Sequence, residues 1–222
     1  MIETIILDLD GPLLDGKHRH YQCYRDILLE KGFKPVSLSI YWKMKRNCVG
    51  RHKLLDASGA VAIYDYFLKT WVERIEQKKY LVLDRLQNQT VKILKEWKRA
   101  RARLLLVTMR NNPSTLDWQL KRLGILPLMD KLIPVGSLQI GASKSQEVKR
   151  QLKQIDTEKT LWIGDTEVDI RAARELGVKI CAVSCGLRSS DFLSKLRPDY
   201  LEPDLKSFFG KYKKRILTRA IV

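Results

Sequence analysis

The sequence predicts an α/β protein in which a doubly wound parallel sheet forms the core and a small α-helical domain is inserted near the amino end. Short apolar runs that suit buried strands alternate with stretches of helical periodicity; the runs are Ile5–Leu7, Leu104–Val107, Thr160–Ile163 and Val178–Val183. This alternation is typical of parallel strands joined by right-handed helical crossovers. The 222 residues suffice for one such core and a smaller domain, but not for two full catalytic domains.

The first apolar run leads directly into two carboxylates. Asp8 and Asp10 flank one residue, and Gly11 follows them. Alternating side chains would place both carboxylates on the same side of the chain, and the glycine allows a sharp turn away from the strand. Because two close carboxylates repel one another, the spacing predicts a hard, oxygen-binding cation such as Mg²⁺. One carboxylate would be free to act as a nucleophile and the other to transfer protons.

The next segment, residues 15–85, offers no buried strand run and is predicted to be mostly helical. Tyr21, Tyr24 and Ile27 follow helical spacing, as do Ile63 and Phe67 further on. Such stripes suit a small helical bundle. We therefore expect residues 1–14 and 86–222 to form the core, and residues 15–85 to form the inserted helical domain.

The helix–strand alternation resumes after the insertion, with a helix predicted at 89–99 before the second core strand. That strand ends at Thr108, whose hydroxyl could hold an anionic oxygen, and the loop that follows contains Arg110 and Asn111. We expect both side chains to contact substrate, because the loop starts at the carboxyl end of a strand. A further helix is predicted at 115–123.

A lysine and a second acidic pair follow downstream. Lys144 lies in the polar loop 141–145, ahead of a predicted helix at 146–154, and could neutralise both carboxylates and a phosphate. The third core strand breaks into a segment that contains Asp165 and Asp169. In an open parallel sheet the carboxyl ends of adjacent strands share one crevice. The four aspartates, Asp8, Asp10, Asp165 and Asp169, could therefore enclose one cation.

The last part of the chain continues the pattern. A helix is predicted from Ile170 to Leu176, where Gly177 ends it, and it precedes the strand at 178–183. We expect Tyr200 and Leu201 to begin the last short core strand or a turn.

The ordered set of Asp-x-Asp-Gly, a strand-terminal Thr, a Lys and a Gly-Asp-x-x-x-Asp motif resembles the haloacid dehalogenase superfamily of phosphohydrolases, in particular its phosphoglycolate-phosphatase-like members with a helical cap. The resemblance covers essentially the whole chain and implies a Rossmann-like core with residues 15–85 as the cap. It further implies that Asp8 is a nucleophile that becomes an aspartyl phosphate. Asp10 would be the general acid and base, which favours phosphate over halide chemistry because the dehalogenases lack this residue.

The remaining roles follow from the same resemblance. Asp8, the backbone carbonyl of Asp10, and Asp165 would bind Mg²⁺, whereas Thr108 and Lys144 would hold the transferring phosphoryl group. Asp169 would support either the metal site or Lys144. The chain has Pro12 where a threonine is frequent in the family, which removes one hydroxyl and one backbone donor from the turn.

The cap is where the resemblance implies substrate selection. The segment Lys45–Lys53 is dense in cations around Gly50, and in related capped phosphatases a glycine-bearing loop of this kind touches the leaving group. Arg46, Arg51 and His52 are therefore candidates for binding a second anionic or hydroxyl-rich moiety. The competing interpretation is a solvated basic helix end.

The formal net charge of +17 would also favour binding to a polyanion such as nucleic acid. The cations are spread along the chain, with one local run at 211–215, and no recognisable nucleic-acid-binding motif surrounds them. We therefore expect a small phosphorylated metabolite as substrate.

No apolar stretch approaches a membrane span and the chain enters its first strand directly, so we expect a cytoplasmic protein without membrane insertion. The sequence assigns no oligomeric state.

Three alternative functions remain open from the sequence. A phosphosugar mutase of the same family would return the phosphoryl group to its substrate. A nucleic-acid end phosphatase would bind oligonucleotides in a salt-dependent manner. A non-catalytic binding protein would retain the fold without turnover.

Overall fold

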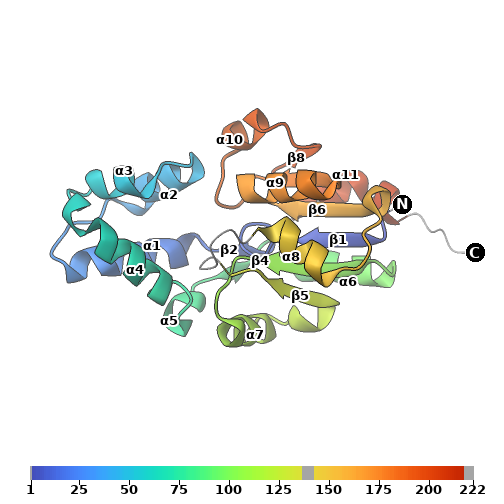
Figure 1. Ribbon diagram of the computed structural model, residues 1–222, viewed down its shortest axis with the longest axis horizontal. Helices are drawn as coiled ribbons and strands as arrows, with labels where there is room; N and C mark the ends of the chain where they lie inside the picture. The colour runs from blue at the N-terminus through green and yellow to red at the C-terminus, as the bar shows by residue number, and fades with distance from the viewer. Residues whose placement is uncertain (1, 137–142, 218–222) are drawn as a thin grey trace, which may run out of the picture. The chain divides into compact units, whose positions relative to one another are not determined.

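The computed structural model describes residues 2–136 and 143–217, with only the backbone described for 214–217 (Figure 1). Contacts divide the chain into two compact units. Unit 1 comprises Met1–Asp15 and Leu86–Val222, and unit 2 comprises Gly16–Arg85.

Unit 1 is built on a six-stranded sheet in the order β5-β4-β1-β6-β7-β8, with every pairing of neighbours parallel. The strands are β1 (Thr4–Leu7), β4 (Arg103–Thr108), β5 (Lys131–Pro134), β6 (Thr160–Gly164), β7 (Lys179–Val183) and β8 (Tyr200–Glu202). The two central neighbours of β1 are in register with it, because Leu7 lies opposite Leu106 on β4 and Ile163 on β6. The carboxyl ends of β1, β4 and β6 therefore lie at the same edge of the sheet.

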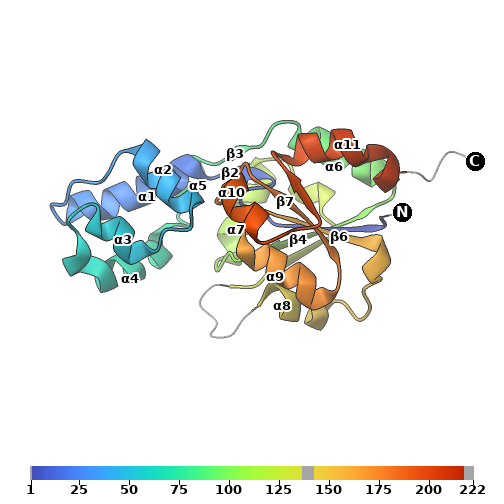
Figure 2. The same ribbon diagram turned by 90° about the horizontal axis from the view of Figure 1, so that it is seen from above.

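Helices cover both faces of this sheet (Figure 2). On one face, alternate side chains of the central strands pack against α6 (Thr90–Arg99), α7 (Pro113–Arg122) and α11 (Leu205–Leu217). On the other face, the intervening side chains pack against α8 (Lys144–Gln151), α9 (Glu167–Leu176) and α10 (Ser190–Lys195). Burial on both faces explains why these strands read as continuous apolar runs in the sequence.

Unit 2 is helical, with its own core. Its helices are α1 (Lys17–Glu30), α2 (Leu38–Arg46), α3 (Arg51–Asp56), α4 (Tyr64–Arg74) and α5 (Lys78–Leu81), with a 3₁₀ turn at Val61–Ile63. Tyr24 stacks on Tyr41 with ring centroids 4.7 Å apart, and Phe67 packs edge-on against Tyr24. The buried ion pair between Arg19 and Asp84, 2.9 Å long, joins the two ends of the unit.

The predicted parallel α/β architecture is confirmed, and the boundaries of individual elements differ in detail. The sequence prediction omitted β5, as well as the two short strands β2 (Leu14–Asp15) and β3 (Arg85–Leu86), which pair with one another. Helix α8 begins at Lys144 and ends at Gln151, where the prediction placed a helix over 146–154. It begins early because the Ser143 hydroxyl accepts a hydrogen bond from the backbone N–H of Gln146 and so caps the helix. Residues 141 and 142 of the predicted Lys144 loop lie outside the described residues.

Candidate active site

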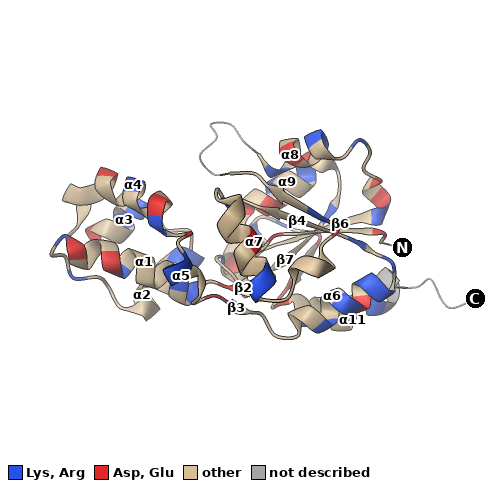
Figure 3. Cartoon of the chain, turned by 90° about the horizontal axis from the view of Figure 1, so that it is seen from below, with Lys and Arg blue, Asp and Glu red and all other residues tan. Residues whose placement is uncertain are grey.

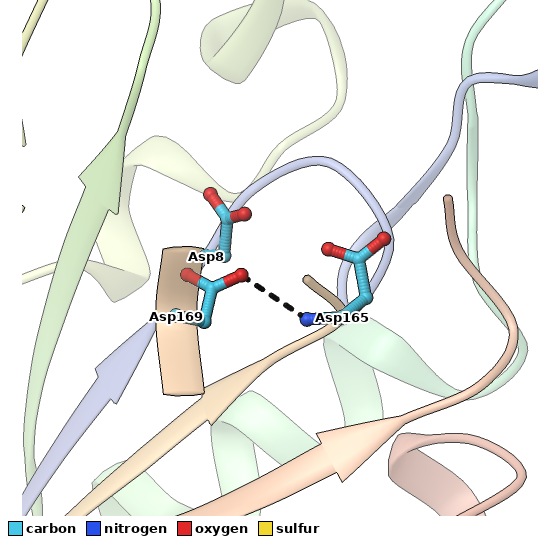
Figure 4. A group of neighbouring side chains, drawn as sticks. All are labelled: Asp8, Asp165 and Asp169. Carbon is cyan, nitrogen blue, oxygen red and sulfur yellow. Dashed lines mark hydrogen bonds between the residues drawn. The ribbon is translucent and has the colours of Figure 1, made fainter. Parts of the chain in front are cut away.

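Three buried carboxylates meet at the carboxyl edge of the sheet (Figure 4). Asp8 follows β1, Asp165 follows the neighbouring strand β6, and Asp169 lies in the first turn of α9. One oxygen from each of the three lies within 4.8 Å of the other two. The convergence follows from the topology, because adjacent parallel strands end at one edge and the next helix starts there.

Lys144 links two of these carboxylates. Its ammonium group donates to Asp8 Oδ2 at 2.9 Å and to Asp169 Oδ1 at 2.7 Å, and its side chain is only 2% exposed. The other oxygen of Asp8 accepts a hydrogen bond from the backbone N–H of Leu9 at 2.8 Å. The position of Lys144 at the start of α8 brings its ammonium group between Asp8 and Asp169.

Both oxygens of Asp169 are occupied by donors. Oδ1 accepts from Lys144 and from the indole N–H of Trp162, at 3.3 Å. Oδ2 accepts from the Thr166 hydroxyl at 2.7 Å and from the backbone N–H groups of Thr166 and Asp165. The bond from the backbone N–H of Thr166 is one half of the capping box at the start of α9. Asp169 is therefore a fixed anion that orients Lys144.

Asp165 has one bonded and one unbonded oxygen. Oδ2 accepts a hydrogen bond from the backbone N–H of Leu187 at 2.5 Å, whereas Oδ1 is buried without a hydrogen-bond partner among the described residues. Two glycines surround this carboxylate closely. A Cβ atom at Gly11 would lie 2.2 Å from Asp165 Cγ, and one at Gly186 would lie 2.0 Å from Asp165 Oδ2. The backbone thus encloses Asp165 and leaves Oδ1 as an available ligand.

The electrostatics of the cluster follow from burial. Burial, and then the Asp169 charge, raise the pKa of Asp8 from 3.8 to about 7, although Lys144 partly opposes the shift. Burial and the charges of Asp8 and Asp169 raise the pKa of Asp165 well above its usual value. Burial would also lower the pKa of Lys144, but Asp169 and Asp8 outweigh it and raise that pKa. Burial opposes ionisation of Asp169 too, yet Lys144 holds its pKa below the usual value.

The cluster fits a divalent cation. With all groups ionised, three carboxylates and one ammonium leave two uncompensated negative charges in a buried place. One divalent cation would balance them, and the unbonded Oδ1 of Asp165 supplies an oxygen ligand of the kind that hard cations prefer.

Asp10 lies outside this group and pairs with Arg110. The guanidinium donates from Nε to Asp10 Oδ2 and from Nη2 to Asp10 Oδ1, both at 3.0 Å. Nη2 also donates to the side-chain carbonyl of Gln119 at 3.3 Å. Sequence reasoning placed Arg110 beside the site but missed this pairing, for which no sequence motif gives a signal.

The other predicted site residues fall in two places. Thr108 is buried at the end of β4, and Asn111 is half-buried in the segment between β4 and α7. Arg46 ends α2 and Arg51 begins α3, with His52 beside it, all in unit 2. Arg51 and His52 are exposed, and Gly50 between the two helices has open space around it. Their contact with substrate stays a prediction.

The sequence also gave no indication of the supporting contacts from the segment after β7. Leu187 and Gly186 act through the backbone, so their side-chain types carry no chemical signature. Trp162, within the predicted strand Thr160–Ile163, and Thr166, in the segment after it, donate to Asp169, which the apolar run and the motif do not predict.

Comparisons with known proteins agree with this geometry. The family model for haloacid dehalogenase-like hydrolases matches residues 2–177. No curated protein matches the chain. Among solved structures, a predicted phosphatase from Clostridium acetobutylicum has a TM-score of 0.77 at 14% identity, with 96% of this chain and 99% of that chain covered. A haloacid dehalogenase-like hydrolase from Streptococcus pneumoniae has a TM-score of 0.68 at 23% identity, with 95% and 98% covered.

A predicted phosphoglycolate phosphatase from Haemophilus somnus shows the same fold, with a TM-score of 0.75 at 17% identity and 95% and 97% of the two chains covered. The TM-scores of these structures show a shared fold, and the family model adds the shared sequence pattern over most of the chain. The strand-end aspartates Asp8 and Asp165 both fall within the matched residues. The chain therefore belongs to the haloacid dehalogenase-like hydrolase family.

Proposed function

We propose that the protein is a Mg²⁺-dependent phosphatase that hydrolyses phosphomonoesters of small metabolites through an aspartyl phosphate on Asp8. The observation that carries the proposal is the buried group of Asp8, Lys144 and Asp165, in which Asp165 Oδ1 has no hydrogen-bond partner among the described residues. The phosphatase names of several solved structures with this fold support the same reaction class.

Asp8 and Lys144 have different roles in the proposed reaction. Asp8 attacks phosphorus, so that a bond forms between its carboxylate oxygen and phosphorus while the ester bond to the leaving group breaks. Lys144, which contacts Asp8 and is fixed by Asp169, stabilises the negative charge on the transferring phosphoryl oxygens. A divalent cation bound at Asp8, the Asp10 carbonyl and Asp165 would neutralise further charge on that group.

Asp10 acts as general acid in the first half of the reaction and as general base in the second. Protonated when the ester binds, it gives that proton to the departing alkoxide, and as a carboxylate it then takes one from the water that attacks the aspartyl phosphate. Attack at phosphorus releases inorganic phosphate and restores the Asp8 carboxylate. Thr108, at the end of the neighbouring strand β4, would hold a phosphoryl oxygen, and Asn111 remains a candidate for contacting the substrate.

Unit 2 is proposed to select the substrate. Its exposed cations at the junction of α2 and α3, including Arg51, suit a substrate with a second anionic or hydroxyl-rich moiety. Catalysis of phosphoryl transfer and recognition of the leaving group would then reside in separate units.

Phosphate release tests the proposal. The full chain is incubated with phosphorylated sugars, nucleotides, phosphoglycolate and end-phosphorylated oligonucleotides, with and without Mg²⁺, and Asp8→Asn serves as the control. We expect Mg²⁺-dependent release from a small ester and at least a ~100-fold loss in the variant. Release that is equal in the variant would contradict the role of Asp8, and isomerised product without net phosphate would identify a mutase.

A further inference from the structure

Arg110 and Asp10, which pair with one another, lie just after the carboxyl ends of two neighbouring strands. Asp10 follows β1 and Arg110 follows β4, and these strands are adjacent and parallel. Two N–H groups of the guanidinium lie 3.0 Å from the two carboxylate oxygens of Asp10. The Arg110 side chain is 5% exposed, while that of Asp10 is 21% exposed. The carboxylate is thus reachable from solvent on one side and held from the protein side.

A third residue holds the arginine in turn. Gln119 lies on α7, has no exposed surface, and accepts a hydrogen bond from Arg110 Nη2 at 3.3 Å. Because α7 packs on the core through Leu116 and Leu120, its position is fixed by the sheet. The hydrogen-bonded series Gln119–Arg110–Asp10 therefore extends from the buried face of α7 to a partly exposed carboxylate that follows β1.

We propose that Arg110 is a positioning residue for the reaction, which holds the Asp10 carboxylate in the orientation that proton exchange requires, with Gln119 fixing Arg110. The inference rests on the proposed function, because it assigns a role within that same site. The sequence-based expectation that Arg110 contacts substrate stays a prediction, and the experiment below distinguishes the two roles.

The side-chain chemistry explains why an arginine suits this role. A guanidinium presents two parallel N–H groups that match both oxygens of a carboxylate, so the pair resists rotation as well as translation. A lysine at the same place would keep the charge but bind as a point, leaving the carboxylate free to turn. General acid–base catalysis depends on this orientation, because the donor and acceptor atoms must approach to about 3 Å.

A double-mutant cycle between Arg110 and Asp10 tests the assignment. Arg110→Lys is made in the wild-type and Asp10→Asn backgrounds, and kcat and KM are measured with 4-nitrophenyl phosphate and with the best alkyl ester of the substrate panel. We expect Arg110→Lys to lower kcat by about 10- to 100-fold while KM stays within about 2-fold. In the Asp10→Asn background the same change should lower kcat by less than about 2-fold, because no oriented carboxylate remains to be lost.

Two further variants separate positioning from a structural role. Gln119→Met keeps side-chain volume and removes the acceptor for Arg110, so it should lower kcat by a few-fold in the wild-type background alone, and it serves as the test if Arg110→Lys does not fold. Arg122→Ala removes an exposed arginine from the same helix and should leave kcat unchanged.

The outcomes distinguish this inference from the proposed function. A kcat loss of equal size in both backgrounds, or a rise in KM with kcat unchanged, would overturn the positioning role and restore direct substrate contact. A wild-type protein that releases no phosphate from any ester contradicts the proposed function, and the role of Arg110 with it. If the wild-type protein releases phosphate but the effect of Arg110→Lys on kcat is the same with and without Asp10, only this inference is contradicted.

Discussion

At the scale of single residues, Asp165 and Asp169 belong to the same motif but differ in the hydrogen bonds that their carboxylates accept. Asp169 accepts hydrogen bonds at both oxygens, from Lys144, Trp162 and the start of α9. Asp165 keeps one buried oxygen without a partner among the described residues. The protein itself therefore meets the hydrogen-bonding capacity of the Asp169 carboxylate, whereas the Asp165 carboxylate keeps an oxygen that a ligand can bind. This difference supports the proposal that Asp165 binds the cation, whereas Asp169 pairs with Lys144.

The pKa of Asp8 predicts how protons and metal compete. Because its folded-state pKa of about 7 exceeds the usual 3.8, the neutral form stabilises the metal-free fold, and that contribution is lost as pH rises from about 4 through 7. Metal ligands must lose their protons, so affinity for Mg²⁺ should rise over the same range. Thermal unfolding with and without Mg²⁺ checks this, and we expect the Mg²⁺-induced rise in Tm to be larger near pH 8 than near pH 5.5.

Asp8→Asn is the matched control for this measurement, since the amide does not titrate. Its metal-free Tm should fall less with rising pH than that of the wild-type protein. A Mg²⁺ effect that is the same at both pH values would contradict the participation of Asp8 in the cation site.

Residue types and their spacing predicted which side chains could meet, but not how they pair. Asp8, Lys144, Asp165 and Asp169 were all proposed from strand ends and motif order, and the structure brings them together. The partner of Asp10 could not be predicted, because Arg110 lies 100 residues away and faces the carboxylate only through the register of β1 with β4.

At the scale of elements, the segment after β7 completes the surroundings of Asp165. Leu187 donates its backbone N–H to Asp165, and Arg188 forms a two-bond ion pair with Glu167 at the start of α9, with both N–O distances 2.7 Å. The side chain of Cys185 contacts the Gly11 carbonyl at 3.4 Å. The segment is thus attached at three places around the carboxylate, which fixes the direction of its unbonded oxygen.

Gly186 in this segment is required for space rather than for backbone freedom. A methyl group there would overlap Asp165 Oδ2 at 2.0 Å and Gly11 Cα at 2.6 Å. We expect Gly186→Ala to displace the carboxylate and lower Mg²⁺ affinity by about 10-fold or more, in line with losses when metal-supporting contacts are removed. Isothermal titration calorimetry of the metal-free protein measures this directly.

The control for this substitution is Gly210→Ala in α11, where nothing lies within 4 Å of the added atom. It should leave Mg²⁺ affinity unchanged and stabilise the helix by up to about 1 kcal/mol, because alanine favours a helical backbone over glycine. Equal Mg²⁺ affinities for Gly186→Ala and wild type would contradict the cation site at Asp165.

The four central strands that sequence reasoning found have a double-sided apolar pattern. β1, β4, β6 and β7 are buried on both faces and appear as continuous apolar runs. The omitted strand β5 lies at the sheet edge, is partly exposed, begins with a lysine and ends with Pro134. The sequence of such an edge strand resembles that of a loop, because only one neighbouring strand and one buried face constrain its residue types.

At the scale of the whole molecule, the positive charge is distributed rather than concentrated. Figure 3 shows Lys and Arg on the helices of both units. Several are neutralised locally on unit 1, for example Arg150 by Glu147 and Arg188 by Glu167. None of the helices among residues 2–136 and 143–217 is long and apolar enough to cross a membrane. The charge itself identifies no partner.

The division into two units predicts separate effects on catalysis and on substrate choice. Arg51→Ala removes an exposed cation from unit 2, so it should reduce kcat/KM for the best metabolite substrate by about 10-fold. Release from 4-nitrophenyl phosphate, which has no second anionic group, should change by less than about 2-fold. Steady-state kinetics with both substrates provide the measurement.

Lys53→Ala, at another exposed cation of the same helix, controls for net charge. Equal losses on both substrates, or equal effects of the two substitutions, would contradict a recognition role for Arg51.

Trapping the phosphorylated enzyme tests directly whether Asp8 is the nucleophile. In Asp10→Asn the attacking water lacks a proton acceptor, so the covalent intermediate should accumulate after addition of 4-nitrophenyl phosphate and Mg²⁺. Acid quenching, digestion and mass spectrometry should then find one phosphoryl group on the peptide that contains Asp8, removable by hydroxylamine. A phosphoryl group on another residue, or a burst of nitrophenol without phosphorylated Asp8, would contradict the account.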